Sequence, residues 1–316
     1  MTNRPELSEI RAASEGMKNV VCRTPLVPFQ SGEPTDIHLK VEIHQPMNSF
    51  KIRGVFHAVA SLGPEGRAKG LSTVSAGNTA QALAWAARHF GVAARSLMPD
   101  TAPSSKIEAV RGLGATPVLV PTEEVFAYMK GHGWEDEPYA FIHPWTDRNV
   151  MTGHGGMGIE IVEDLPDVDS VFIPVGGGGL LGGVGCALKA LRPEVKIFGV
   201  EPAGCPSLYE AIQKGGPVTV ECKTICDGVA VPYITEEMFP LLSALVEKVI
   251  LVSEETVRDS IRVLCLGSKL IVEPAGALSL AAALATPLSD RGKSVCIVSG
   301  GNLDTDLLIG ILRAQK

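Results

Sequence analysis

One lysine of this chain stands in a local sequence that favours covalent chemistry. Lys51 lies near the end of the segment HQPMNSFKIRG (44–54). Asn48 or Ser49 can cap a helix that begins at Phe50. Lys51 then falls in the first helical turn, where the positive end of the helix lowers the pKa of an amine. Such an amine can form a Schiff base, although most lysines are simply solvated and the spacing alone does not set this one apart.

A run of four glycines is the second chemical feature. Gly176–Gly179 follow the apolar segment SVFIPV and precede a helix that we expect to begin near Leu180. Residues without a Cβ atom let backbone N–H groups approach an anion closely, and a helix N-terminus adds its positive end. The run therefore predicts a phosphate cradle. The alternative is a loop that only needs unusual dihedral angles, but four consecutive glycines exceed what a turn requires.

The same stretch also fits a dinucleotide-binding fingerprint. Gly177, Gly179 and Gly182 match GxGxxG, and Glu201 ends the next expected strand about 20 residues later, where a ribose-binding acid would lie. This match makes an NAD-dependent oxidoreductase the alternative from a different class of function. Its position weakens it, because such fingerprints usually lie in the first strand–helix–strand unit of their domain and several units precede this one.

Three loops with small or polar residues each follow an expected strand. They are SAGNT (75–79), VGGGGLLGG (175–183) and SGGN (299–302). In parallel α/β sheets, ligands bind at the carboxyl ends of the strands. Three such loops in one chain therefore predict a shared cleft for a small molecule.

The elements that must hold these loops alternate along the chain. The expected strands are 71–75, 95–98, 116–120, 139–143, 170–175, 196–201, 248–252 and 294–299. The expected helices are 79–90, 104–113, 149–163, 180–191, 254–266, 274–285 and 305–314. Runs such as VFIPV and VCIVS are apolar on both faces, as is typical of central strands in parallel sheets. The pattern predicts an α/β fold with right-handed crossovers, and a change of lobe near residues 143–147.

Composition excludes several classes of function. The 316 residues carry a net charge of −7, which argues against a protein that binds nucleic acid through its phosphates. The longest nearly uncharged stretch, 274–288, is too short to span a bilayer. The first sixteen residues mix acids and bases, so we expect no signal peptide and a cytoplasmic location. Seven scattered cysteines without a CxxC motif favour reduced thiols over a disulfide framework.

Six segments occur in the order found in fold type II pyridoxal-phosphate enzymes, and they identify what the chain resembles. They are HQPMNSFKIRG, SAGNTAQALAWAARHFG, PVGGGGLLGG, DGVAV, VEPAGALSLAAAL and VSGGN. Within that family the chain is most similar to threonine/serine dehydratases (ammonia-lyases) and serine racemases, from about Thr24 to Leu308. The resemblance implies a two-domain α/β fold, similar to that of the tryptophan synthase beta subunit, with parallel-stranded sheets. Residues 1–60 and 147–316 would form a large domain that binds pyridoxal 5'-phosphate, and residues 61–146 a small substrate-side domain.

The resemblance also implies a role for each residue of these motifs. Lys51 would carry the cofactor, Phe50 and Gly228 would lie on the two faces of its ring, and Glu273 would lie nearby. The ring's 3-oxygen and nitrogen would meet Asn78 and Ser299, respectively. The phosphate would be held by backbone amides of Gly176, Gly177, Gly178, Gly179 and Leu180. The substrate carboxylate would be held by the loop residues Ser75, Ala76, Gly77, Asn78 and Thr79.

The implied reaction is removal of water and ammonia from a β-hydroxy L-amino acid of the threonine/serine type, in amino-acid catabolism. Lys51 would be the catalytic base at Cα. Ser299 places a neutral hydroxyl where other sites for this cofactor have an acidic residue. The neutral group favours β-elimination. Serine racemases carry a second serine at the position of Ala76, so we expect little racemisation. A homodimer or homotetramer is implied by the relatives.

Departures from the family pattern leave the substrate open. They are Met47-Asn48, Thr79, Trp145 and Gly156, and all are expected near the substrate side. A bulkier or more polar substrate, such as phenylserine or 3-hydroxyaspartate, and serine racemisation are the alternatives. A divalent-cation site of some relatives begins at a glutamate matching Glu201, but its partner position is occupied by Ser207, so we expect no metal.

Overall fold

A six-stranded sheet forms the larger of two sheets in this computed structural model, which describes residues 4–30 and 35–314. Its strand order is β1-β2-β10-β7-β8-β9. All neighbouring strands run parallel except β1 and β2, which are antiparallel. The strands are β1 (Leu26–Pro28), β2 (Ile37–Val41), β7 (Ser170–Pro174), β8 (Lys196–Pro202), β9 (Lys248–Val252) and β10 (Ser294–Val298).

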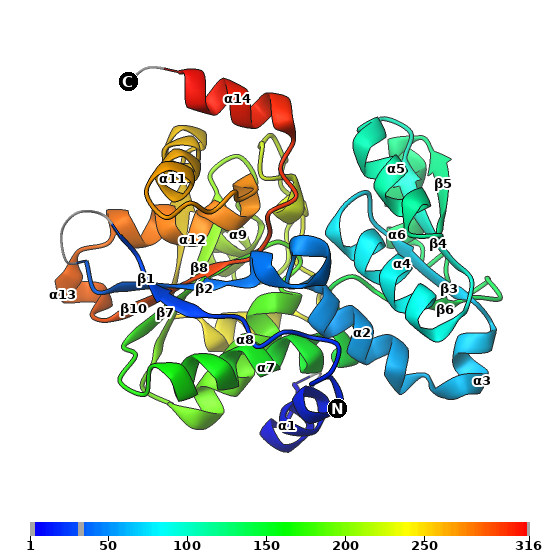
Figure 1. The fold of residues 1–316 in the computed structure, drawn as a ribbon, viewed down its shortest axis with the longest axis horizontal. Helices are drawn as coiled ribbons and strands as arrows, with labels where there is room; N and C mark the ends of the chain where they lie inside the picture. The colour runs from blue at the N-terminus through cyan, green and yellow to red at the C-terminus, as the bar shows by residue number, and fades with distance from the viewer. Residues whose placement is uncertain (1–3, 31–34, 315–316) are drawn as a thin grey trace.

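A second, four-stranded sheet has the order β5-β4-β3-β6 and is entirely parallel. Its strands are β3 (Leu71–Val74), β4 (Ala94–Pro99), β5 (Thr116–Val120) and β6 (Ala140–Phe141). Figure 1 shows this sheet with α4, α5 and α6 on one side of the molecule, and α2 between it and the six-stranded sheet. Helix α2 contacts both α4 and α7, so it connects the two halves.

Helices cover both sheets. The first half of the chain contains α1 (Leu7–Gly16), α2 (Lys51–Ser61), α3 (Gly63–Ala68), α4 (Asn78–Phe90), α5 (Ser104–Gly112), α6 (Thr122–Lys130) and α7 (Arg148–Asp164). The second half contains α8 (Gly179–Leu191), α9 (Ser207–Lys214), α10 (Phe239–Leu245), α11 (Glu254–Leu266), α12 (Pro274–Ala285), α13 (Leu288–Arg291) and α14 (Thr305–Arg313). Three short 3-10 turns are η1 (Glu42–His44), η2 (Pro46–Asn48) and η3 (Asp227–Val229).

The position of strand β7 explains why its sequence is apolar throughout. Phe172 packs into the hydrophobic core formed with α11 and α12, whereas Val171 and Ile173 pack into the core formed with α8 and α10. All three side chains are fully buried. A strand covered by helices on both faces has no solvent side, so polar residues do not alternate along it. The predicted α/β fold with parallel sheets is confirmed, whereas the domain boundaries near residues 60 and 147 stay a prediction.

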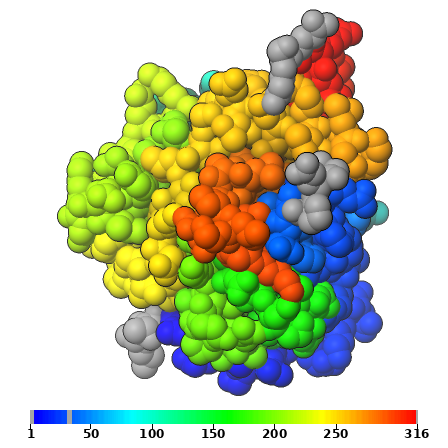
Figure 2. All heavy atoms as spheres, turned by 90° about the vertical axis from the view of Figure 1, so that its left-hand side faces the viewer, coloured from blue at the N-terminus to red at the C-terminus, as the bar shows by residue number. Residues whose placement is uncertain are grey.

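Strand β2 was not predicted, because its sequence is interrupted by His38 and Lys40. Lys40 is nevertheless fully buried. Its ammonium lies 2.6 Å from Glu160 and donates to the Thr24 carbonyl at 2.7 Å. β2 pairs with β10, so a segment near the N-terminus lies beside one near the C-terminus. On the face shown in Figure 2, blue surface from the first part of the chain adjoins orange surface from its last part.

A buried ion network anchors α2 to the six-stranded half of the molecule. Arg53 is 3% exposed and contacts two carboxylates, Glu42 at 2.8 Å and Glu160 at 2.7 Å. Glu160, on α7, also holds Lys40 of β2. The guanidinium therefore joins the helix that begins at Lys51 to two elements of the larger half.

The expectation of reduced thiols is wrong for two of the seven cysteines. Cys205 and Cys222 form a disulfide with their Cα atoms 4.4 Å apart. Their backbones run side by side, since the Lys223 N–H donates to the Gly204 carbonyl at 2.8 Å. The two cysteines are 17 positions apart, and their spacing in the sequence did not reveal this pairing.

No helix within residues 4–30 and 35–314 combines the length and apolar character that crossing a membrane requires.

Replacing Arg53 with alanine should destabilise the protein by about 3–5 kcal/mol, because two carboxylates lose their buried partner. Unfolding in urea measures this change. Arg23→Ala is the matched control: Arg23 pairs with Glu163 at 2.6 Å, but both side chains are about half exposed. Its removal should cost less than about 1 kcal/mol. Similar losses for the two variants would contradict the anchoring role.

Candidate active site

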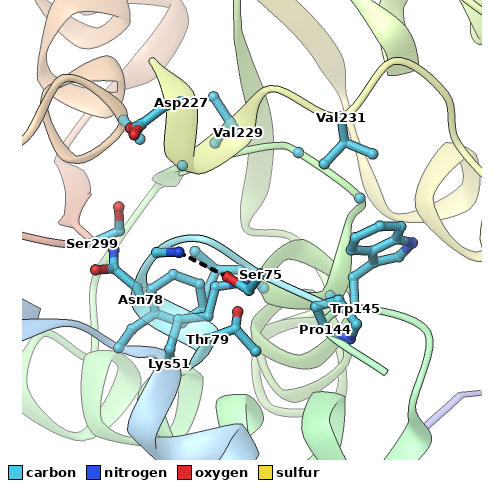
Figure 3. Close-up of a pocket in the computed structure, with 18 of the residues that line it drawn as sticks. Lys51, Ser75, Asn78, Thr79, Pro144, Trp145, Asp227, Val229, Val231 and Ser299 are labelled. Carbon is cyan, nitrogen blue, oxygen red and sulfur yellow. Dashed lines mark hydrogen bonds between the residues drawn. The ribbon is translucent and has the colours of Figure 1, made fainter. Parts of the chain in front are cut away.

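One cavity of about 290 Å³ is lined by every residue that the sequence assigned to the site. It lies where β3, β7 and β10 end, so the three loops predicted to share a cleft do so. Figure 3 shows Ser299 and Asn78 on one side of this cavity, Lys51 and Thr79 below, and Trp145 with Pro144 on the opposite side. The assigned lining residues are Phe50, Lys51, Ser75, Ala76, Gly77, Asn78, Thr79, Gly176, Gly177, Gly178, Gly179, Leu180, Gly228, Glu273 and Ser299.

Backbone pairing holds the segment before Lys51 against the loop after β10. The Phe50 N–H donates to the Ser299 carbonyl at 3.0 Å, and the Gly301 N–H donates to the Asn48 carbonyl at 2.9 Å. Between these bonds, Ser49 and Gly300 form an antiparallel bridge. The pairing brings position 51 next to position 299, although the two lie in opposite parts of the chain.

A tight turn reverses the chain just before this pairing. Met47 and Asn48 have φ values of 69° and 51°, in the left-handed region that few side chains adopt. Asparagine tolerates this region better than most residues. The helix then begins at Lys51 with Phe50 as its N-cap, and the Lys51 N–H approaches the Ser49 hydroxyl at 3.4 Å. Of the two expected caps, only Ser49 therefore faces the helix end.

The Lys51 amine is a weak base in this setting. Burial lowers its pKa to about 8, while the carboxylate of Glu273 opposes the shift. Its Nζ lies 5.0 Å from the centre of the Phe50 ring. The amine stands in the first turn of α2, where the helix also disfavours positive charge. An appreciable share of the amine is therefore neutral near neutral pH, as a nucleophile or base requires.

Glu273 is the acid that acts on the charge of this amine. Burial raises its pKa to about 7, and the Asp227 carboxylate acts in the same direction. The Asn78 amide donates to its Oε1 at 2.8 Å and opposes the shift. Gly300 makes room for this carboxylate, because a Cβ atom there would lie 2.1 Å from Oε1.

The loop from Ser75 to Thr79 opens α4 toward the cavity. The Ser75 hydroxyl accepts the Gly77 N–H at 3.1 Å, and the Ser75 carbonyl accepts the Ser96 hydroxyl at 2.7 Å. These bonds hold the loop between β3 and the first turn of α4. The first N–H groups of a helix have no partner within it, so they suit an anion such as a carboxylate.

The glycine run opens α8 toward the same cavity. Gly178 has a φ of 92°, which favours glycine. A Cβ atom on Gly177 would lie 2.3 Å from the Trp145 ring, and one on Gly179 would lie 2.9 Å from the Trp145 Cα. The glycines thus allow Trp145 to pack on the loop while their N–H groups remain at the helix end. The N-termini of α4 and α8 therefore suit two ligands that each bring one anionic group to a helix end.

Several lining residues were missed by sequence reasoning. Lys106 of α5 forms an ion pair with Asp227 of η3, which joins the two halves beside the cavity. Asn302 and Gln81 also line it. Lys106 resembles any surface lysine in the sequence, and only the fold brings it to the site. Asn302 had a signal, since it ends the SGGN loop.

Glu201 does not line this cavity. Its carboxylate accepts the N–H groups of Leu208 and Tyr209 and the hydroxyl of Ser207, so it caps α9. Burial raises its pKa to about 7, against the effect of these bonds. The acid needed for the dinucleotide interpretation is thus engaged elsewhere.

The comparisons with known proteins agree with this geometry. Residues 17–300 match the family described as pyridoxal-phosphate dependent enzyme. The chain belongs to this family. The L-threonine ammonia-lyase of Thermotoga maritima is 42% identical over 313 residues, which cover 97% of this chain and 78% of that protein.

Solved structures of other family members share the fold. The structure of maize serine racemase superposes with a TM-score of 0.89 at 31% identity, covering 96% of each chain. The processed threonine deaminase isoform 2 of Solanum lycopersicum also has a TM-score of 0.89 at 31% identity, covering 100% of this chain and 96% of that one. As a family member, the chain is an enzyme that uses pyridoxal phosphate.

The residues of the cavity fit this cofactor independently of these comparisons. The Lys51 amine has a lowered pKa, as bond formation with an aldehyde requires. Cβ atoms on Gly176–Gly179 would collide with Val229, Trp145 and Leu242, so this loop offers the cavity only its backbone. The Ser299 hydroxyl belongs to the lining of the same cavity.

The Lys51 amine of the cofactor-free chain should react with acylating reagents with a midpoint near pH 8. Only the neutral amine attacks, so labelling should rise as the pH passes through about 8. Mass spectrometry of labelled peptides between pH 6 and pH 10 measures the midpoint. Lys18, whose side chain is 68% exposed, serves as the control, because it lacks the burial on which the prediction rests. Coincident midpoints for the two lysines would contradict the burial argument.

Proposed function

We propose that this enzyme removes water and ammonia from a β-hydroxy L-amino acid of the threonine/serine type and yields a 2-keto acid. The observation that carries the proposal is an amine of lowered pKa at Lys51 in the same cavity as Ser299 and two helix N-termini. The named relatives, an L-threonine ammonia-lyase and a threonine deaminase, support the same reaction.

The cofactor would be held covalently by Lys51 and through its phosphate by the backbone of Gly176–Gly179 and Leu180. When bound, it supplies an electron sink for the charge that develops at the substrate Cα. Phe50 would support one face of the ring, and the Phe50 ring itself rests on the buried His154, with their centroids 4.7 Å apart. Gly228 would face the other side, and a Cβ atom there would lie 3.1 Å from Ala275.

The substrate carboxylate would be bound by the backbone N–H groups at the start of α4 and by Ser75. This contact fixes the Cα–H bond relative to the Lys51 amine. With the substrate bound through its own amine, the Lys51 amine would be free to take the Cα proton, a role that its lowered pKa in the cofactor-free chain favours. The β-hydroxyl would leave as water after taking up one proton, which balances the proton removed from Cα, and the released enamine would consume one water to give the keto acid and ammonia.

Ser299 favours elimination over other outcomes. Its hydroxyl is neutral and cannot stabilise a positive charge on a ring nitrogen as a carboxylate does. The stabilisation of charge at Cα is then limited, so early departure of the β-hydroxyl is favoured. By resemblance to serine racemases, position 76 would face the substrate from the side opposite Lys51, and Ala76 offers no acid there, which disfavours return of a proton to that face.

The side-chain end of the cavity is mostly apolar. Pro144, Trp145 and Val231 line it. This lining accepts the methyl group of threonine and supports the threonine/serine type. An aromatic side chain, as in phenylserine, fits the same chemistry, and 3-hydroxyaspartate would need a cation there.

Assembly and location belong to the proposal as well. We infer a homodimer or homotetramer in the cytoplasm, and two domains divided near residues 60 and 147. Light scattering of the purified chain tests the assembly.

Lys51→Ala should abolish both keto-acid release and the visible absorbance of the bound cofactor, since the covalent bond and the base are lost together. The purified enzyme should release keto acid from L-threonine and L-serine faster than from phenylserine or 3-hydroxyaspartate. Lys18→Ala, at an exposed site, is the control and should match the wild type. A colourless wild-type protein that binds NADH would refute the proposal.

Ala76→Ser should increase the racemisation of L-serine, because a hydroxyl then stands on the face opposite Lys51. Chiral chromatography of serine after incubation, beside a pyruvate assay, gives the ratio of racemisation to elimination. The wild type should eliminate faster than it racemises. A wild type that mainly racemises would count against the role given to Ala76.

A further inference from the structure

We propose that Asn302 is a positioning residue that sets the orientation of the Asn78 amide for the cofactor. Asn302 lines the cavity, but it acts through its neighbour. The inference rests on the proposed contact between Asn78 and the oxygen of the cofactor ring.

Asn302 uses both protons of its side-chain nitrogen. Nδ2 donates to the backbone carbonyl of Met47 at 2.9 Å and to Oδ1 of Asn78 at 2.7 Å. The Met47 carbonyl belongs to the left-handed turn that precedes Lys51. One amide group thus connects the loop after β10, the lysine turn and the first residue of α4.

The Met47 carbonyl determines which atom donates and which accepts in the hydrogen bonds from Asn302 to Asn78 and from Asn78 to Glu273. A carbonyl oxygen only accepts, so the atom of Asn302 that faces it must be the nitrogen. The same nitrogen faces Asn78, whose nearest atom must then be its oxygen. The nitrogen of Asn78 is left to donate toward Glu273 Oε1, at 2.8 Å, on the cavity side.

This direction matters because the two ends of an amide have the same shape. Without a fixed donor at Oδ1, the Asn78 amide can turn over and present its oxygen to the cavity. An oxygen there would face the carboxylate of Glu273 and the anionic oxygen of the cofactor ring, and both contacts would be repulsive. Asn302 and Glu273 therefore select the same orientation from the two ends of the Asn78 amide, the one in which Asn78 donates toward the cavity.

The side-chain amide of Asn302 contacts both the turn before Lys51 and the Asn78 amide. The Gly301 N–H, one residue earlier, already holds the Asn48 carbonyl at 2.9 Å. The turn therefore retains a backbone bond when the Asn302 side chain changes, whereas Oδ1 of Asn78 loses the donor described above. Asn302→Asp keeps the size and converts the donor into an acceptor, and the negative charge that it adds is the same in both backgrounds of the cycle described next.

The test is a double-mutant cycle between positions 302 and 78. Asn302→Asp should weaken pyridoxal-phosphate binding by about tenfold in the wild-type background. The same change should have little further effect in an Asn78→Ala background, because the amide on which it acts is gone. Equilibrium dialysis of the full chain with pyridoxal phosphate gives the dissociation constants.

A second readout is the pH at which the visible absorbance of the holoenzyme changes. Loss of the donor to the ring oxygen makes that oxygen more basic, so the midpoint should move to higher pH in Asn302→Asp. Asn149→Asp, on the exposed first turn of α7, is the matched control and should leave both readouts unchanged.

The outcomes separate this inference from the proposed function. Equal weakening in the wild-type and Asn78→Ala backgrounds would assign Asn302 a merely structural role and overturn the inference. Wild-type binding by Asn302→Asp would overturn it too, while leaving the dehydratase proposal intact. A wild-type chain that fails to bind the cofactor at Lys51 would remove both.

Discussion

The site depends on the short antiparallel pairing between residues 48–50 and residues 299–301. Two backbone hydrogen bonds, which flank the Ser49–Gly300 bridge, hold a turn near the N-terminal part of the chain against the carboxyl end of β10. Because these are main-chain contacts, they fix the start of α2 and therefore the position of Lys51. The Arg53 network anchors the same helix within its first turn. The reactive amine is thus held by the larger half, while the substrate loop belongs to the smaller sheet.

Burial then gives these positioned groups their chemistry. It lowers the pKa of the Lys51 amine and raises the pKa of the Glu273 carboxyl, so the two values lie close together. Both groups therefore change protonation closer to neutral pH than they would in water. The helix ends of α4 and α8 contribute positive potential through their backbones. A cavity of this kind favours an anionic ligand while allowing its lysine to lose a proton.

The local sequence was sufficient to predict the elements that are buried on both faces and the loops that follow them. The strand at 170–174 and the helix at 254–266 have patterns that their own residues determine. β2 was missed because Lys40, buried by partners far along the chain, interrupts its apolar run. Lys106 was missed for the same reason, since Asp227 reaches it only through the fold. The roles given to individual residues came from family resemblance, which spacing alone could not replace.

Trp145 packs so closely on the glycine run that Gly177 and Gly179 have no room for a side chain. A methyl group on Gly177 would collide with the indole, and a smaller side chain at position 145 would leave a void beneath the loop. Evolutionary drift is therefore restricted at the glycine positions, whereas position 145 already departs from the family pattern above an unchanged glycine run. A lineage that altered its substrate range would sooner vary position 145 or Val231, on the facing segment, than the glycine floor.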